Sequence, residues 1–221
     1  MNLTKNIFFK NFERKLNTKS LKKRMDQIIS NPNQNLKSLT SEYKYSYSKK
    51  KIKKFKNFSI IRIIGIGGSI LGIKAIYNFL NFKIKKKVQF VDNLISFFPL
   101  KKLNQKILNL IISKSGNTLE TILNTNILIK KNQKNIFITQ NNKNYLRALA
   151  QKLKSDVIDH NNFIGGRYAV LSEVGMLPSS LMGLNEKKFK QFNNVIKNQK
   201  FLNSLVLNVA NIIFFLKKKK I

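Results

Sequence analysis

The sequence of 221 residues contains no cysteine and a single histidine, His160. Disulfide bonds and thiolate chemistry are therefore excluded. Only nine acidic residues accompany that histidine, so a metal site built from several ligands is not expected. We accordingly expect neither a metal nor a cofactor.

Long apolar runs are also scarce. The N-terminus, MNLTKNIFFKNFERK, has an apolar core far too short for a secretory signal. The most apolar stretch, FLNSLVLNVANIIFFL at 201–216, is interrupted by asparagine and falls short of a continuous membrane-spanning segment. We therefore expect a cytoplasmic protein without a membrane partner.

Arginine is rare although the formal net charge is +34. Only five of the 43 basic residues are arginine, and lysine is spread along the whole chain together with asparagine, isoleucine and phenylalanine. The codons of these residues are AT-rich, so drift in an AT-rich genome explains the charge without a polyanionic partner. Specific nucleic-acid binding, which favours arginine and concentrated charge, is not expected. Non-specific binding that fades with salt stays open.

Periodicity divides the chain into three parts. Residues 1–57 are lysine-rich with broken helical spacing, residues 58–185 alternate between buried strands and amphipathic helices, and residues 186–216 have the spacing of one further helix that leads to the end at 221. Strands are expected in 58–67, 87–93, 107–114, 135–140 and 155–160, and helices in 69–81, 118–131 and 143–154. This alternation predicts an α/β fold, a doubly wound parallel sheet flanked by helices, with helical N- and C-terminal extensions.

Glycines follow the first predicted strand in GIGGSILG, residues 65–72. Gly65, Gly67 and Gly68 let the backbone turn and approach a ligand, and Ser69 opens a helix whose first N–H groups are unpaired. The spacing differs from the GxGxxG of dinucleotide sites, and Asp92 after the next strand is weak support for one. A tight turn and a ligand-binding loop both fit this block.

Hydroxyl groups gather in SKSGNTLET, residues 113–121, after a predicted central strand. Ser113, Ser115 and Thr118 can present three hydroxyls to one anion beside the helix amides, and Gly116 permits the turn. The alternative is that Thr118 is an ordinary N-cap and Thr121 only packs. Open α/β sheets bind ligands at this edge, which favours a phosphate site.

The third block, GGRY at 165–168, places Arg167 after two glycines in a largely apolar stretch. An arginine in apolar surroundings needs an anionic partner. That partner is either the negative charge of a substrate or a carboxylate from Asp156, Asp159 or Glu173.

These blocks, in this order and spacing, resemble the glucose-6-phosphate isomerase family, with GGRYAVLSEVGMLPSSLMG (165–183) the most specific. The resemblance covers roughly 58–185, which would be the family's first sugar-isomerase (SIS) domain. It implies that Arg167 steadies the enediolate of glucose 6-phosphate and fructose 6-phosphate interconversion, a step of glycolysis and gluconeogenesis. It also implies that the substrate is contacted by Gly68, Ser69, Ser113, Lys114, Ser115, Gly116, Asn117, Thr118 and Gly166.

The chain departs from the family pattern in some places. Ile70 stands where many members have aspartate, and no segment resembles the family's Q-x-x-x-E-S-[LN]-G-K, which carries the catalytic base. Glu173 and Glu186 fit no family motif, and we interpret His160 as a loop histidine. We therefore expect an N-terminal part of an isomerase that binds sugar phosphates weakly and turns over little alone. A frameshift in the adenine-rich codons of KKKKI is our hypothesis for the truncation, and a real gene end stays open.

One alternative is a stand-alone SIS domain that binds or senses a sugar phosphate. Full-length members of the family are expected to be homodimers, and the oligomeric state of this chain stays open.

Overall fold

The computed structural model describes residues 16–94, 106–130, 132–192, 195 and 198–219. The first fifteen residues of the predicted N-terminal extension, and the last two residues of the chain, lie outside this part.

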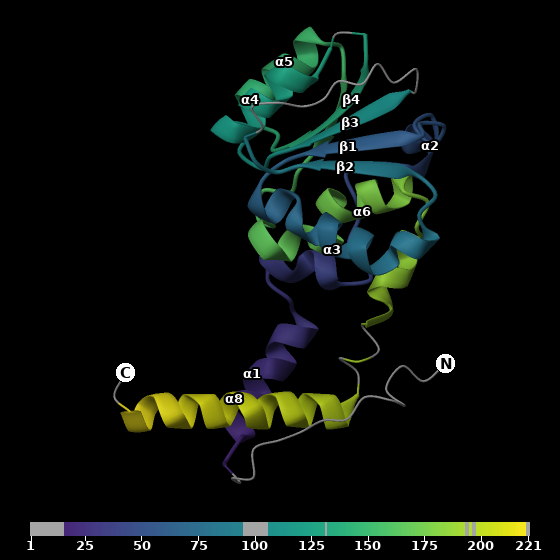
Figure 1. Ribbon diagram of the computed structural model, residues 1–221. Coiled ribbons are helices and arrows are strands. Elements are labelled where there is room, and N and C mark those ends of the chain that lie inside the picture. Colours follow the sequence, from purple (N-terminus) through teal and green to yellow (C-terminus); the bar gives the residue numbers. More distant parts are fainter. Residues whose placement is uncertain (1–15, 95–105, 131, 193–194, 196–197, 220–221) are drawn as a thin grey trace.

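A sheet of five parallel strands forms the centre of the molecule, in the order β2-β1-β3-β4-β5 (Figure 1). The strands are β1 (Ile60–Ile64), β2 (Lys87–Val91), β3 (Ile107–Ile112), β4 (Lys134–Thr139) and β5 (Asp156–Asp159). Every residue of β1 is buried, as its unbroken apolar run predicted for a strand covered on both faces. β2 and β3 lie on opposite sides of β1, so the direction in which strands are added to the sheet reverses after β2. A topological switch therefore lies between β1 and β3.

Helices cover both faces of the sheet, which confirms the predicted doubly wound α/β class. On one face, α3 (Leu71–Leu80) and α6 (Glu173–Leu181) pack over a large apolar cluster. On the other, α4 (Leu119–Leu128) and α5 (Tyr145–Lys152) enclose a smaller one around Phe137. Short 3₁₀ helices connect the larger elements: η1 (Gln34–Leu39), η2 (Gly67–Ser69), η3 (Asn81–Lys83), η4 (Gly166–Leu171) and η5 (Glu186–Phe192).

The N-terminal extension contributes α1 (Lys19–Ser30), η1 and α2 (Lys49–Lys53). At the other end, the prediction of one helix over 186–216 is wrong. The chain forms η5 and then a separate helix, α8 (Gln199–Lys219). Asn198 causes the new start, because its side-chain oxygen accepts hydrogen bonds from the backbone N–H groups of Lys200 and Phe201 at 2.9 and 3.2 Å, as an N-cap does.

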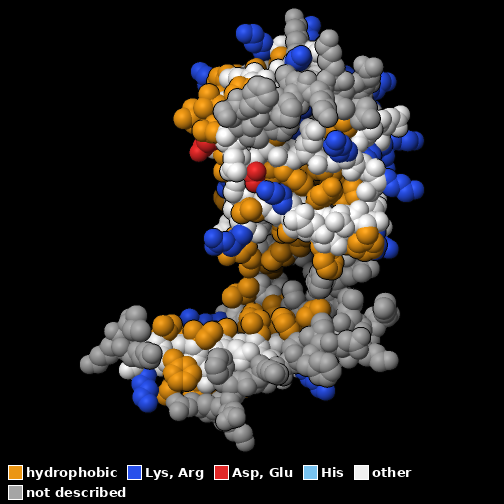
Figure 2. Space-filling model, in the orientation of Figure 1, with side chains coloured by type: hydrophobic (Ala, Val, Ile, Leu, Met, Phe, Trp, Pro, Cys, Tyr) orange, Lys and Arg blue, Asp and Glu red, His pale blue; other side chains and the backbone are white. Residues whose placement is uncertain are grey.

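Helix α8 packs against α1 away from the sheet, and much of it is exposed (Figures 1 and 2). Ile212 and Phe215 are 53% and 44% exposed. Within the described residues, α8 is one helix that is long and apolar enough to cross a membrane by length and composition, with 28% of its apolar window buried. A single helix of this kind is weak evidence for a membrane span, because helices that serve other roles pass the same test.

Candidate phosphate site at the sheet switch

Two of the predicted loops lie at the switch point. The glycine block follows the carboxyl end of β1, and the SKSGNT segment follows the carboxyl end of β3, the strand paired with β1. Open parallel sheets bind ligands in the crevice that such a switch creates. The topology therefore places both predicted binding loops side by side.

The three hydroxyls of the second block cluster together. Ser113 Oγ lies 3.0 Å and Ser115 Oγ 3.4 Å from Thr118 Oγ1. Backbone N–H groups of the loop also point inward, because Gly116 N–H donates to Ser113 Oγ and Asn117 N–H to Ser115 Oγ, each at 3.2 Å. Ser113 is buried whereas Ser115 is exposed, so the cluster reaches from the sheet to the surface.

Thr118 occupies the N-cap position of α4, but its side chain makes no capping hydrogen bond. Its hydroxyl is directed to the two serines instead, and the first-turn N–H groups of a helix have no partner within that helix. An uncapped N-terminus carries partial positive charge and favours an anion. The alternative that Thr118 is only an N-cap therefore loses its main physical support. Thr121 is buried, as expected of a packing residue.

The turn of this loop packs closely against the end of β4 and the start of α5. Gly116 has φ +68°, and a Cβ there would lie 2.0 Å from Asn144 Oδ1. Asn117 Oδ1 accepts a hydrogen bond from Tyr145 N–H at 2.9 Å. Its side-chain oxygen thus ties the loop to α5.

The third block lies close to the other two, to the first through its backbone and to the second through the side chain of Lys114. A Cβ on Gly68 would lie 2.5 Å from the Cα of Gly166, and one on Gly165 would lie 3.0 Å from Lys114 Nζ. The structure thus brings together blocks that are about a hundred residues apart in the sequence. A cavity of about 610 Å³ opens beside the contact, and its lining includes Gly68, Gly166 and Arg167 with apolar residues of α3.

Arg167 itself is exposed at the start of η4, not enclosed by apolar side chains as its sequence neighbours suggested. The three carboxylates proposed as structural partners are engaged elsewhere. Asp156 pairs with Lys54 at 3.0 Å, Asp159 pairs with Arg147 at 2.5 Å, and Glu173 accepts hydrogen bonds from Tyr43 and Asn161. In the described part of the chain, none of the ion pairs involves Arg167. Its guanidinium group is available to an anionic ligand.

His160 follows β5, as expected, but it is only 3% exposed. Its Nδ1 lies 2.9 Å from the carbonyl oxygen of Asn161, an acceptor, so Nδ1 carries a proton. Burial lowers the pKa of His160, and Lys114 adds to this, whereas the Asn161 bond and Glu173 oppose it. The neutral ring is the favoured form.

Asp92, the weak support above for a dinucleotide site, forms an ion pair with Lys74 of α3, with Nζ 2.5 Å from Oδ2. Among the described residues, no group of three or more histidine or acidic side chains is placed to hold a metal ion.

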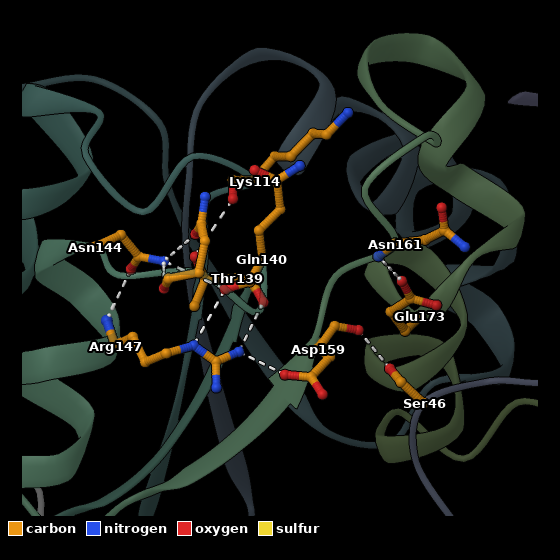
Figure 3. A network of polar contacts seen from close by, with 10 residues as sticks. Ser46, Lys114, Thr139, Gln140, Asn144, Arg147, Asp159, Asn161 and Glu173 are labelled. Carbon is orange, nitrogen blue, oxygen red and sulfur yellow. Dashed lines mark hydrogen bonds and ion pairs between the residues drawn. The ribbon is translucent and has the colours of Figure 1, made fainter.

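A polar network that the sequence did not indicate lies beside the loop of residues 113–118 (Figure 3). Arg147 of α5 donates to the carbonyl oxygens of Thr139 and Gln140 and pairs with Asp159. Gln140 N–H and the Thr139 hydroxyl in turn donate to the carbonyl oxygen of Lys114. The network links the ends of β4 and β5 to the loop after β3. The signal in the sequence was only that Lys114, Gln140 and Asp159 stand at or near the ends of three successive predicted strands.

Comparison with known proteins decides the family. The family described as phosphoglucose isomerase matches residues 15–211. The chain belongs to the phosphoglucose isomerase family. Among curated relatives, glucose-6-phosphate isomerase of Methanocaldococcus jannaschii is 31% identical over 184 residues, which cover 73% of this chain and 45% of the relative. The enzyme of the same name from Mycoplasma genitalium is 36% identical over 186 residues, covering 70% and 42%.

The chain thus spans less than half the length of these two relatives. A crystal structure of a hypothetical protein from Thermus thermophilus aligns with 90% of this chain and 52% of its own, with a TM-score of 0.65 and 19% identity. At that identity the likeness supports the fold alone. The members of the phosphoglucose isomerase family that match this chain are sugar-phosphate isomerases by name, which supports the enzyme class predicted above.

Proposed function

We propose that this chain forms the phosphate-holding part of a glucose-6-phosphate isomerase and binds glucose 6-phosphate or fructose 6-phosphate at the switch between β1 and β3. The observation that supports this most directly is the hydroxyl cluster of Ser113, Ser115 and Thr118 at the uncapped N-terminus of α4. Such an arrangement can hold a phosphate without many cations. Residues 58–185 are the binding unit in this proposal, in a cytoplasmic protein.

The remaining site residues take roles around that phosphate. Gly68 and Ser69, from the loop after β1, contact the sugar phosphate, and Lys114 adds positive charge beside the turn of Gly165. Arg167, with its guanidinium exposed, stabilises the negative charge that develops on the substrate as the enediolate forms. Gly166 has φ +54° and lies against Gly68, so it keeps the arginine turn close to the glycine loop after β1.

Proton transfer between C1 and C2 needs a base within hydrogen-bond reach of the substrate. We assign no residue of this chain to that step. Glu173, a buried carboxylate of the third block, already accepts hydrogen bonds at both oxygens. Binding is therefore the part of the reaction that we propose for these residues.

Isothermal calorimetry with fructose 6-phosphate, inorganic phosphate and sulfate tests the proposal. Thr118→Val removes one hydroxyl of the cluster and keeps the side-chain shape, so we expect phosphate affinity to fall about tenfold, the worth of one hydrogen bond to a charged group. Thr121→Val is the matched control in the same helix. The Thr121 hydroxyl is buried and has no hydrogen-bond partner in the described part of the chain, so its loss should leave binding unchanged.

Equal weakening by both variants, or no binding by the unmodified chain, contradicts the proposal. The alternative of a stand-alone SIS-type sensor predicts tight binding of a phosphosugar by this chain without turnover, and a dimer that is stable in solution. Analytical ultracentrifugation with and without fructose 6-phosphate separates the two hypotheses.

A further inference from the structure

Glu173 is a buried carboxylate whose two oxygens are both occupied. It is 1% exposed at the start of α6. Oε1 accepts a hydrogen bond from the backbone N–H of Asn161, and Oε2 accepts one from the hydroxyl of Tyr43, both at 2.7 Å. No lysine or arginine of the described residues forms an ion pair with it. Burying a carboxylate with only two neutral donors and no cation carries a desolvation cost. A buried group of this kind is therefore a candidate for a specific structural role.

One of those donors begins the segment that leads to Arg167. Asn161 also uses its own side chain, because Oδ1 accepts hydrogen bonds from the backbone of Phe163 and Ile164 at 2.9 and 3.3 Å. Ile164 is fully buried, and the chain then passes through Gly165 to the contact between Gly166 and Gly68. The carboxylate of Glu173 thus holds Asn161, the first residue of this turn (Figure 3). The turn ends at the contact of Gly166 with Gly68.

The other donor comes from the N-terminal extension. Burial and the neighbouring Glu173 raise the pKa of the Tyr43 hydroxyl, so it remains a donor. The same extension makes two further contacts around this turn. Ser46 Oγ donates to the carbonyl oxygen of Asp159, just before the turn, at 2.5 Å, and Ser38 Oγ donates to that of Tyr168, just after Arg167, at 3.4 Å. The extension therefore braces this turn from outside.

We propose that Glu173, bridging Tyr43 and Asn161, is a positioning residue that sets the turn carrying Arg167 against the phosphate loop. The inference rests on the role proposed above for Arg167. Loss of the carboxylate leaves the Asn161 N–H buried without an acceptor and frees Tyr43 from the turn. The phosphate loop itself makes no contact with Glu173 among the hydrogen bonds described for residues 113–118, so its geometry should survive.

Hydrogen exchange measured by mass spectrometry on the full chain tests the positioning directly. In Glu173→Ala we expect exchange of the segment 161–168 to speed up about tenfold or more, while 113–118 keeps its protection. Glu173→Gln retains an acceptor for Asn161 and should restore most of the protection. Glu186→Ala is the matched control, because Glu186 is also buried, at 5% exposed, but pairs with Lys49 at 3.3 Å.

Calorimetry on the same variants supplies the functional readout. In Glu173→Ala, affinity for fructose 6-phosphate should fall about tenfold relative to inorganic phosphate, since the phosphate loop is intact and the arginine turn is not. The Glu186→Ala variant should keep the ratio of the unmodified chain. Unchanged exchange and an unchanged ratio in Glu173→Ala overturn this inference alone. An unmodified chain that binds no sugar phosphate overturns the proposed function and this inference together.

Discussion

Replacing Gly116 by alanine should lower the free energy of unfolding by more than the backbone strain at this position alone would lower it. An alanine at φ +68° costs about 1–2 kcal/mol because its Cβ crowds the backbone. The new Cβ would lie 2.0 Å from Asn144 Oδ1, which caps α5 by accepting from Arg147 N–H at 2.9 Å. Displacing this cap costs about 1 kcal/mol more. With the crowding of Thr139, 2.7 Å from the same Cβ, we expect about 3 kcal/mol in all.

Urea unfolding followed by circular dichroism measures this loss as a change in the free energy of unfolding. Gly67→Ala is the matched control, because Gly67 has φ +56° and a Cβ added there would meet no atom within 4 Å, so only the strain of about 1–2 kcal/mol applies. Equal destabilisation by the two variants would refute the reasoning, since the contact with Asn144 would then contribute nothing. A smaller loss in Gly116→Ala would refute it more strongly.

Three further outcomes are expected. Gly68→Ala places a Cβ 2.5 Å from the backbone of Gly166, which has no flexible side chain to yield, so the two loops must move apart: we expect a lower melting temperature and a sugar-phosphate affinity that falls about tenfold by calorimetry. Arg167→Lys keeps the charge but loses the planar fork, and should weaken binding of a sugar-acid phosphate that mimics the enediolate, while inorganic phosphate binds as before. Burial lowers the pKa of His160 below its unfolded value of about 6.5, so stability is full above that pH and decreases as the pH falls below it. Chemical unfolding at several pH values should show this slope, and His160→Asn should flatten it.

The fold was predictable where burial on both faces leaves a simple pattern. The apolar run of β1 and the hydroxyl-rich start of α4 both formed as expected. The role of Arg62 was not predictable. It is 3% exposed in the middle of β1, and its Nε donates a hydrogen bond to Gln89, its register partner on β2. Neither residue signals the other in the sequence.

The candidate site was predictable block by block but not in its assembly. Family resemblance indicated the loops that carry Ser113 and Arg167, whereas the contact of Gly68 with Gly166 depends on how the two loops pack. Glu173 fits no family motif, so the sequence does not indicate its role. Its importance comes from Tyr43, which is 130 positions away along the chain, and no local pattern connects the two.

The meeting of Gly68 with Gly166 also has a consequence for synthesis on the ribosome. The glycine loop after β1 and the hydroxyl loop after β3 emerge early, but the arginine turn meets Gly68 only after β5 and the residues that follow have emerged. Contacts between such distant positions form late, because loop closure must precede them. A nascent chain therefore forms its hydroxyl loop first and sets the arginine turn in place last, so the parts of the proposed site come together only near the end of translation of this domain.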